Sequence, residues 1–298
     1  LWLYVQRDEE YLKSTRPLLN IGGLMRYNRG KGGIVLNQLN ILDREKLPLN
    51  KRKKANITKA VLANMGAVFA GAKTIVAGAG LRYEPVRIPD ARFNAFVNQS
   101  GHPKWFPGPG DLSKMPVGNQ VFANVDYHLS DFSTSPVPTV FMLKGSGSEV
   151  QDTEVENIEV SRPADAVFFL HTFHPSGSIG NWQRQHDEAI RRRREQPEPP
   201  IVFQYVVHYA NGEQTIVPVV WRSGVGPWVS NVPAALPAAA IAWTGPLRDD
   251  EQAAVYSMQW NNPDPDVPIQ SIDIVSSPDG PKWGAPAVFA ITTARALK

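Results

Sequence analysis

The sequence predicts a mainly β protein, a jelly-roll β-sandwich preceded by a short α/β segment. Three observations carry this prediction. Proline and glycine are frequent, with 26 and 23 among 298 residues, which suits many turns and disfavours long helices. Short apolar runs follow one another in the second half of the chain without helical spacing between most of them. Asn211 and Gly212 separate two such runs and predict a tight hairpin, because both residue types accept positive φ.

The first 83 residues predict the α/β segment. Residues 1–5 and 34–42 are apolar and indicate buried strands. From Pro48 to Gly71, apolar residues recur at helical spacing, and these two residues suit the start and the end of a helix. A strand followed by such a crossover helix is typical of the end of a doubly wound domain.

The remaining chain, residues 84–298, predicts the sandwich. Residues 84–100 indicate an extended linker. The predicted strands then cover residues 139–143, 157–160, 166–173, 201–209, 214–221, 239–245, 254–260, 269–275 and 286–292. Between two of them, residues 180–200 are polar, charged and followed by prolines, so we expect a long inserted loop with a helical turn.

The stretch from 259 to 276 predicts a rigid connection between two strands of one sheet. Asn and Asp close turns through their side chains, and Pro ends the hydrogen-bond ladder, so Asn262 to Asp266 suits such a turn. In the strand that follows, strict alternation places Ile269 on one face, and Ile272 and Ile274 on the other.

Composition excludes several classes of site and partner. The chain has no Cys, so neither a disulfide framework nor a thiolate metal site can form. The formal net charge of +3 is slight, and the basic runs at 51–54 and 191–194 lack interleaved aromatic residues, so we expect no nucleic-acid partner. No apolar run is long enough to span a bilayer, so we expect no membrane partner. The chain opens without Met inside an apolar run, which we interpret as part of a longer protein.

Four stretches resemble one family in the right order. The residues 260–273 read W-x-N-P-x-P-x-x-x-I-x-S-I-D, and this pattern resembles the closing hairpin of galactose-binding-like jelly-roll modules at the C-terminus of bacterial, β-galactosidase-like glycoside hydrolases. Residues 108–131 resemble the opening of these modules, and residues 164–173 and 203–219 resemble their central strands. Where the family has Gly before a Val–Phe strand, this chain has Asn124.

A shorter resemblance concerns the N-terminal segment. Residues 30–42 and the predicted helix resemble the last strand and helix of a glutamine-amidotransferase-like domain, without the nucleophilic Cys of that chemistry. The two resemblances imply a non-catalytic carbohydrate-binding or accessory module, whose partner is a carbohydrate or an upstream catalytic domain. They also imply an extracellular or periplasmic, polysaccharide-related role.

Two alternatives stay open. The chain could be a glycoside hydrolase acting through carboxylates of the jelly-roll loops, although its acidic residues stand in no recognisable catalytic context. It could also be a structural or assembly protein that uses the sandwich for protein contacts, for instance in a homo-oligomer. Fold alone does not decide between these functions.

Candidate site residues follow from the chemistry of sugars. A sugar ring offers an apolar face and hydroxyl edges, so it binds aromatic platforms beside planar polar groups. The predicted ligand-binding residues are Trp105, Trp182, Arg184, Arg222 and Trp228. The resemblance also implies a calcium site, since jelly rolls of this type often carry one; its predicted ligands are Asp111 and Asp126, with Asp131 and Glu149 as further candidates. His171 and His174 are predicted to be packed rather than to bind metal, because positions i and i+3 of a strand point to opposite faces, and His208 is assigned a structural role.

Overall fold

The computed structural model describes the backbone of residues 15–17, 24–29 and 32–37, and also residues 77, 80–98, 102–108, 110–131, 137–192, 194–248 and 250–297. The chain divides into two compact units, residues 1–58 and 59–298. In the first unit, β1 (Thr15–Pro17), β2 (Leu24–Arg29) and β3 (Gly32–Asn37) form an antiparallel sheet. β3 covers part of the strand predicted over residues 34–42, and the α/β character of this segment stays a prediction. The strand and helix predicted over 1–5 and 48–71 lie outside the described residues.

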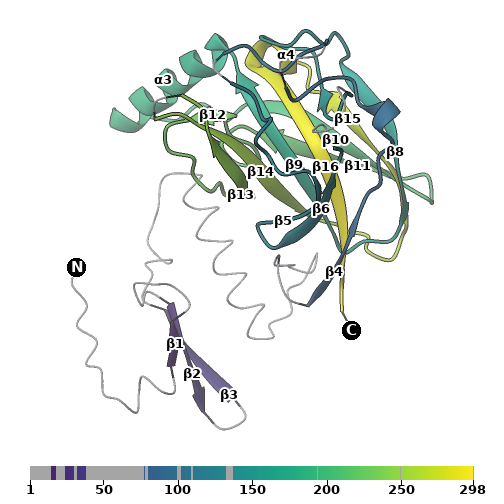
Figure 1. The fold of residues 1–298 in the computed structure, drawn as a ribbon. Helices are drawn as coiled ribbons and strands as arrows, with labels where there is room; N and C mark the ends of the chain where they lie inside the picture. Colours follow the sequence, from purple (N-terminus) through teal and green to yellow (C-terminus); the bar gives the residue numbers. More distant parts are fainter. Residues whose placement is uncertain are drawn as a thin grey trace. The chain divides into compact units, whose positions relative to one another are not determined.

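The second unit is mainly β, and its smaller sheet has four antiparallel strands. Their order is β11-β10-β15-β8. The bounds are β8 Glu154–Arg162, β10 Ile201–Tyr209, β11 Gln214–Val220 and β15 Ile269–Ser276. Figure 1 shows these strands stacked behind the longer strands of a second sheet.

The second sheet has seven antiparallel strands around the long strand β16 (Gly284–Ala296). β9 (Ala166–Pro175) pairs with β16 and with β14 (Gln252–Asn261). The margins are formed by β4 (Leu81–Pro85), β7 (Phe141–Met142), β12 (Val229–Ser230) and β13 (Ala239–Pro246). Two short helices, η1 (Asp90–Arg92) and α4 (Gly280–Trp283), lie in connections.

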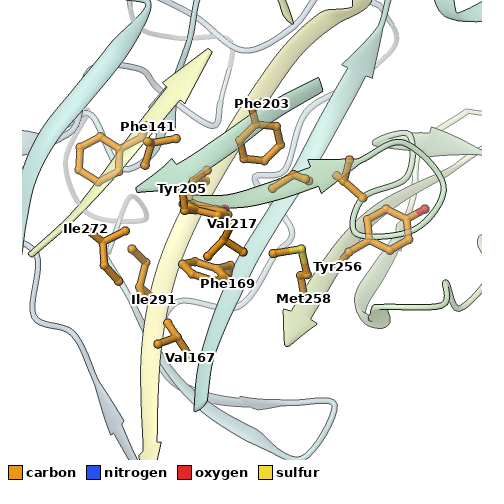
Figure 2. Packing of buried hydrophobic residues seen from close by; sticks show 14 of the residues in the cluster. Phe141, Val167, Phe169, Phe203, Tyr205, Val217, Tyr256, Met258, Ile272 and Ile291 are labelled. Atoms are coloured by element: carbon orange, nitrogen blue, oxygen red, sulfur yellow. The ribbon is translucent and has the colours of Figure 1, made fainter. Parts of the chain in front are cut away.

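The main hydrophobic core lies between these two sheets. Phe169 of β9 stacks on Tyr205 of β10 with ring centroids 3.8 Å apart, and Met258 of β14 and Ile272 of β15 belong to the same cluster. Figure 2 shows these side chains converging from both sheets. Burial of this apolar surface supplies most of the free energy that favours the β-sandwich-like arrangement.

The seven-stranded sheet is also covered on its other face. The hairpin of β5 (Gly118–Phe122) and β6 (Val125–Leu129), together with loops between residues 93 and 117, forms a second core cluster with Phe168, Leu170 and Phe289. Consequently β9 and β16 are buried on both faces along most of their length. This explains why their sequences are continuous apolar runs rather than alternating ones.

The insertion predicted as a long loop is instead largely a helix. α3 (Gly177–Arg191) begins after Ser176, whose side chain accepts a hydrogen bond from the backbone N–H of Ser178, 3.1 Å away. Ile179 and Trp182 lie one turn apart and are buried against the main core. The prediction of a loop was wrong because the apolar stripe of α3 is short, and the charged residues of its C-terminal half make the segment as a whole polar.

The connection at residues 262–268 joins two sheets, not two strands of one sheet. β14 lies in the seven-stranded sheet and β15 in the four-stranded one. Asn262 is 3 % exposed and donates to the carbonyl oxygens of Ala164 (2.8 Å) and Asp264 (3.1 Å). It also accepts from the hydroxyl of Tyr209 (2.6 Å) and the N–H of Asp264 (3.0 Å). The Asn therefore fixes the crossing point between the sheets.

The predicted alternation of β15 is also wrong at its start. Ile269, Ile272 and Ile274 all belong to the main core. The register of β15 shifts between Ile269 and Ser271 against β8, and the facing strand shifts at His208 and Tyr209. Such a β-bulge inserts one residue into the strand, and the side chain of Ile269 therefore points to the core face like those of Ile272 and Ile274.

The predicted hairpin is confirmed, and a second hairpin turns at two residues with positive φ. β10 and β11 pair across Asn211 and Gly212 as predicted, although among these two only Gly212 has positive φ, at 87°. β5 and β6 turn at Ala123 and Asn124, with φ of 50° and 63°. The position where the resembled family has Gly therefore requires a left-handed backbone, which Asn accepts better than most residues.

Candidate functional site

Two of the predicted ligand-binding tryptophans lie together inside the protein. Trp105 and Trp228 are each 1 % exposed, and their rings meet edge to face at 5.5 Å. The Trp228 indole N–H donates to His174 Nδ1 over 3.0 Å, and Phe106 stacks on the same imidazole. In the described structure these rings fill the second core and present no open platform to a ligand.

The other predicted residues are spread over α3 and a turn. Trp182 is 7 % exposed and donates its indole N–H to the carbonyl oxygen of Glu198, 3.0 Å away. Arg184 is exposed on α3 and donates to Asn181 Oδ1. Arg222 is exposed with φ of 56° in the turn after β11. The exposed arginines belong to different elements, and Trp182 packs inward from α3.

The predicted calcium ligands have local structural roles. Asp111 Oδ1 accepts from the N–H of Ser113 over 2.9 Å, and the Asp126 carbonyl oxygen accepts from the hydroxyl of Thr292 over 2.7 Å. Glu149 binds His102 and the N–H of Lys104, and these hydrogen bonds lower the pKa of its carboxyl. Across the described ranges, no group of three or more His, Asp or Glu side chains could hold a metal ion. Calcium stays a prediction, because carbonyl oxygens can also serve as its ligands.

The two histidines of β9 are packed and hydrogen-bonded, as predicted. His171 is fully buried, with Nδ1 2.7 Å from the Tyr205 hydroxyl and Nε2 2.9 Å from the Gly224 carbonyl oxygen. Because a carbonyl only accepts, Nε2 carries the proton and Nδ1 accepts from Tyr205. Burial lowers the pKa of His171 to about 4 and also lowers that of His174. Both rings are therefore neutral at pH 7.

The face of the four-stranded sheet that points away from the core has a different character. We call it the outer face; its members are Gln204, Val206, His208, Ile216, Pro218, Asp273 and Val275. Strand register places Ile216, Val206 and Asp273 in one row across β11, β10 and β15. Ile216 is 54 % exposed, and none of the other members is buried. The result is a surface on which aliphatic groups are mixed with planar polar groups.

A hydrogen-bonded pair stands at the centre of the outer face. His208 Nε2 lies 2.6 Å from Asp273 Oδ2, and Asp273 Oδ1 accepts from the backbone N–H of Asn157 over 2.7 Å. Asn157 has φ of 57°, at a register shift between β15 and β8. Asp273 thus holds the imidazole in one orientation and also binds an irregular part of the neighbouring strand.

From the sequence, His208 was expected to be structural, and Asp273 was not identified as a functional residue. The signal for the outer face was present in the alternation of β10, where Phe203, Tyr205 and Val207 are buried and the residues between them are not. The pairing of His208 with Asp273 could not be predicted, because these residues are 65 positions apart.

Comparison with known proteins adds no relative: no family model matches this sequence, and no curated protein matches it. The galactose-binding-like resemblance therefore stays a prediction. No helix in the described part of the chain has both the length and the apolar character needed to cross a membrane.

Proposed function

We propose that this chain is a non-catalytic, carbohydrate-binding accessory module of a larger glycoside-hydrolase-like protein. In this proposal the second unit is a galactose-binding-like jelly roll. The observation that carries the proposal is the outer face, where aliphatic side chains and planar hydrogen-bonding groups lie side by side on one sheet. A sugar ring needs both kinds of group at once.

The geometry of Asp273 supports binding rather than turnover. Glycoside hydrolysis needs two carboxyl groups that face one sugar, of which one donates or removes a proton. Both oxygens of Asp273 already accept hydrogen bonds, one from His208 and one from the N–H of Asn157. Such a carboxylate is held in one orientation by its two hydrogen bonds and suits a positioned acceptor for hydroxyl groups.

The experiment is a glycan-array screen paired with a glycoside hydrolysis assay on one preparation of the chain, each with and without calcium. We expect binding without turnover. Turnover that disappears when a single loop carboxylate is replaced would support a glycoside hydrolase instead. A stable homo-oligomer that neither binds nor cleaves glycans would support an assembly role. Binding that requires calcium would support the predicted site at Asp111 and Asp126.

A further inference from the structure

The outer face has an acidic margin. β8 borders β15 and carries Glu154, Glu156 and Glu159 among its exposed residues, and Glu154 is the register partner of Val275. Asp273 adds a further carboxylate one strand away. Two described cations lie near this margin: Arg92 donates to the backbone carbonyl oxygen of Glu156, and Arg162, at the end of β8, is paired with Glu84. Anionic groups therefore dominate this side of the sheet.

The other side of the outer face is aliphatic. Ile216 and Pro218 are both exposed on β11, two residues apart, and Val206 and Gln204 are their register partners on β10. Two residues along a strand span about 7 Å, and neighbouring strands lie about 4.8 Å apart. A patch of these dimensions can accept the apolar face of a sugar ring, and His208 and Asp273 then lie at its hydroxyl edge.

We propose that the outer face is the carbohydrate site and that its ligand is an uncharged or amino-sugar glycan, not an acidic one. This inference rests on the proposed function. Val206 and Ile216 contact the apolar face of a sugar ring, while the His208 and Asp273 side chains bind its hydroxyls. The carboxylates of Asp273 and β8 repel uronate and sulfate groups, because like charges at short range are unfavourable in a partly desolvated contact.

The test compares two matched variants. Ile216→Glu puts a carboxylate on the outer face, whereas Val121→Glu makes the same change at a residue of β5 that is 68 % exposed. Both positions are exposed, so both variants should fold, and circular dichroism checks this. Binding is measured by affinity electrophoresis in gels that contain a neutral galactan, a neutral β-glucan, chitosan or polygalacturonate.

The expected result is retardation by a neutral glycan that Ile216→Glu weakens about tenfold and Val121→Glu leaves unchanged. Chitosan should lose less affinity in Ile216→Glu, because the added carboxylate attracts its ammonium groups. Equal affinity in both variants and the wild type would overturn the assignment of the site and leave the proposed function standing. Preferential binding of polygalacturonate would overturn the assignment of the ligand class. No binding of any glycan here or on the array would overturn the proposed function as well.

Discussion

The buried imidazole of His171 should make the sandwich sensitive to acid. Its pKa is lowered from 6.5 to about 4 by burial, whereas in the unfolded chain it has its ordinary value. Between these two pH values the unfolded state binds a proton that the folded state does not. The contribution of His171 to stability is therefore fully present above pH 6.5, and it is lost as the pH falls toward 4.

The magnitude follows from the same two values. A tenfold change in a protonation equilibrium is worth about 1.4 kcal/mol, so the free energy of unfolding should lose about 3 kcal/mol over this range from His171 alone. Burial also lowers the pKa of His128 and His174, so their contributions have the same sign. The wild type must therefore be compared with a variant that lacks only the His171 imidazole.

The assay is urea unfolding followed by tryptophan fluorescence at pH 7, 6 and 5, because buried tryptophans report on the sandwich. His171→Gln should be less stable than the wild type at pH 7. Its free energy of unfolding should then fall less steeply as the pH is lowered, with a slope smaller by up to about 1.4 kcal/mol per pH unit, which corresponds to one proton. Identical pH slopes in the two proteins would refute the reasoning. So would an NMR titration in which the His171 ring gains its proton near pH 6.5.

Three further predictions concern the packing. Trp105→Phe should lower the free energy of unfolding by about 1 kcal/mol less than Trp228→Phe does. The reason is that the Trp105 indole N–H has no described partner, whereas that of Trp228 is hydrogen-bonded. Chemical denaturation of the two variants measures the difference. The double change Ala123→Asn and Asn124→Gly should stabilise the β5–β6 hairpin by about 0.5–1 kcal/mol, since both positions have positive φ; an unchanged or lower melting temperature would contradict this. Asn262→Ala should lower the free energy of unfolding by about 3 kcal/mol, because four groups lose their hydrogen bonds to the Asn262 side chain. A loss below about 1 kcal/mol in urea unfolding would show that Asn262 does not fix the crossing point.

Local chemistry was sufficient for part of the fold. The apolar runs of β9, β10 and β16 identify strands, because no other short element buries so many β-branched and aromatic side chains in sequence. The hairpin at Asn211 and Gly212 follows from backbone preferences that act within a few residues. The packed role of His171 and His174 also follows from their place in an apolar strand.

Other features depend on which segments meet. Trp105 and Trp228 look like exposed loop residues in the sequence, and only the second core layer buries them. The connection at residues 262–268 has the composition of any rigid turn, and only strand pairing shows that it joins two sheets.

By itself, the sequence determined that this chain is mainly β, and it also located most of the strands. Its composition excluded disulfides and thiolate metal sites. These properties depend on residue type and on spacing within one segment. The tertiary structure decided that the seven-stranded sheet is covered on both faces and that His208 pairs with Asp273 on the outer face. Such contacts join residues that are far apart in the chain, and their free energies arise only when the sheets assemble.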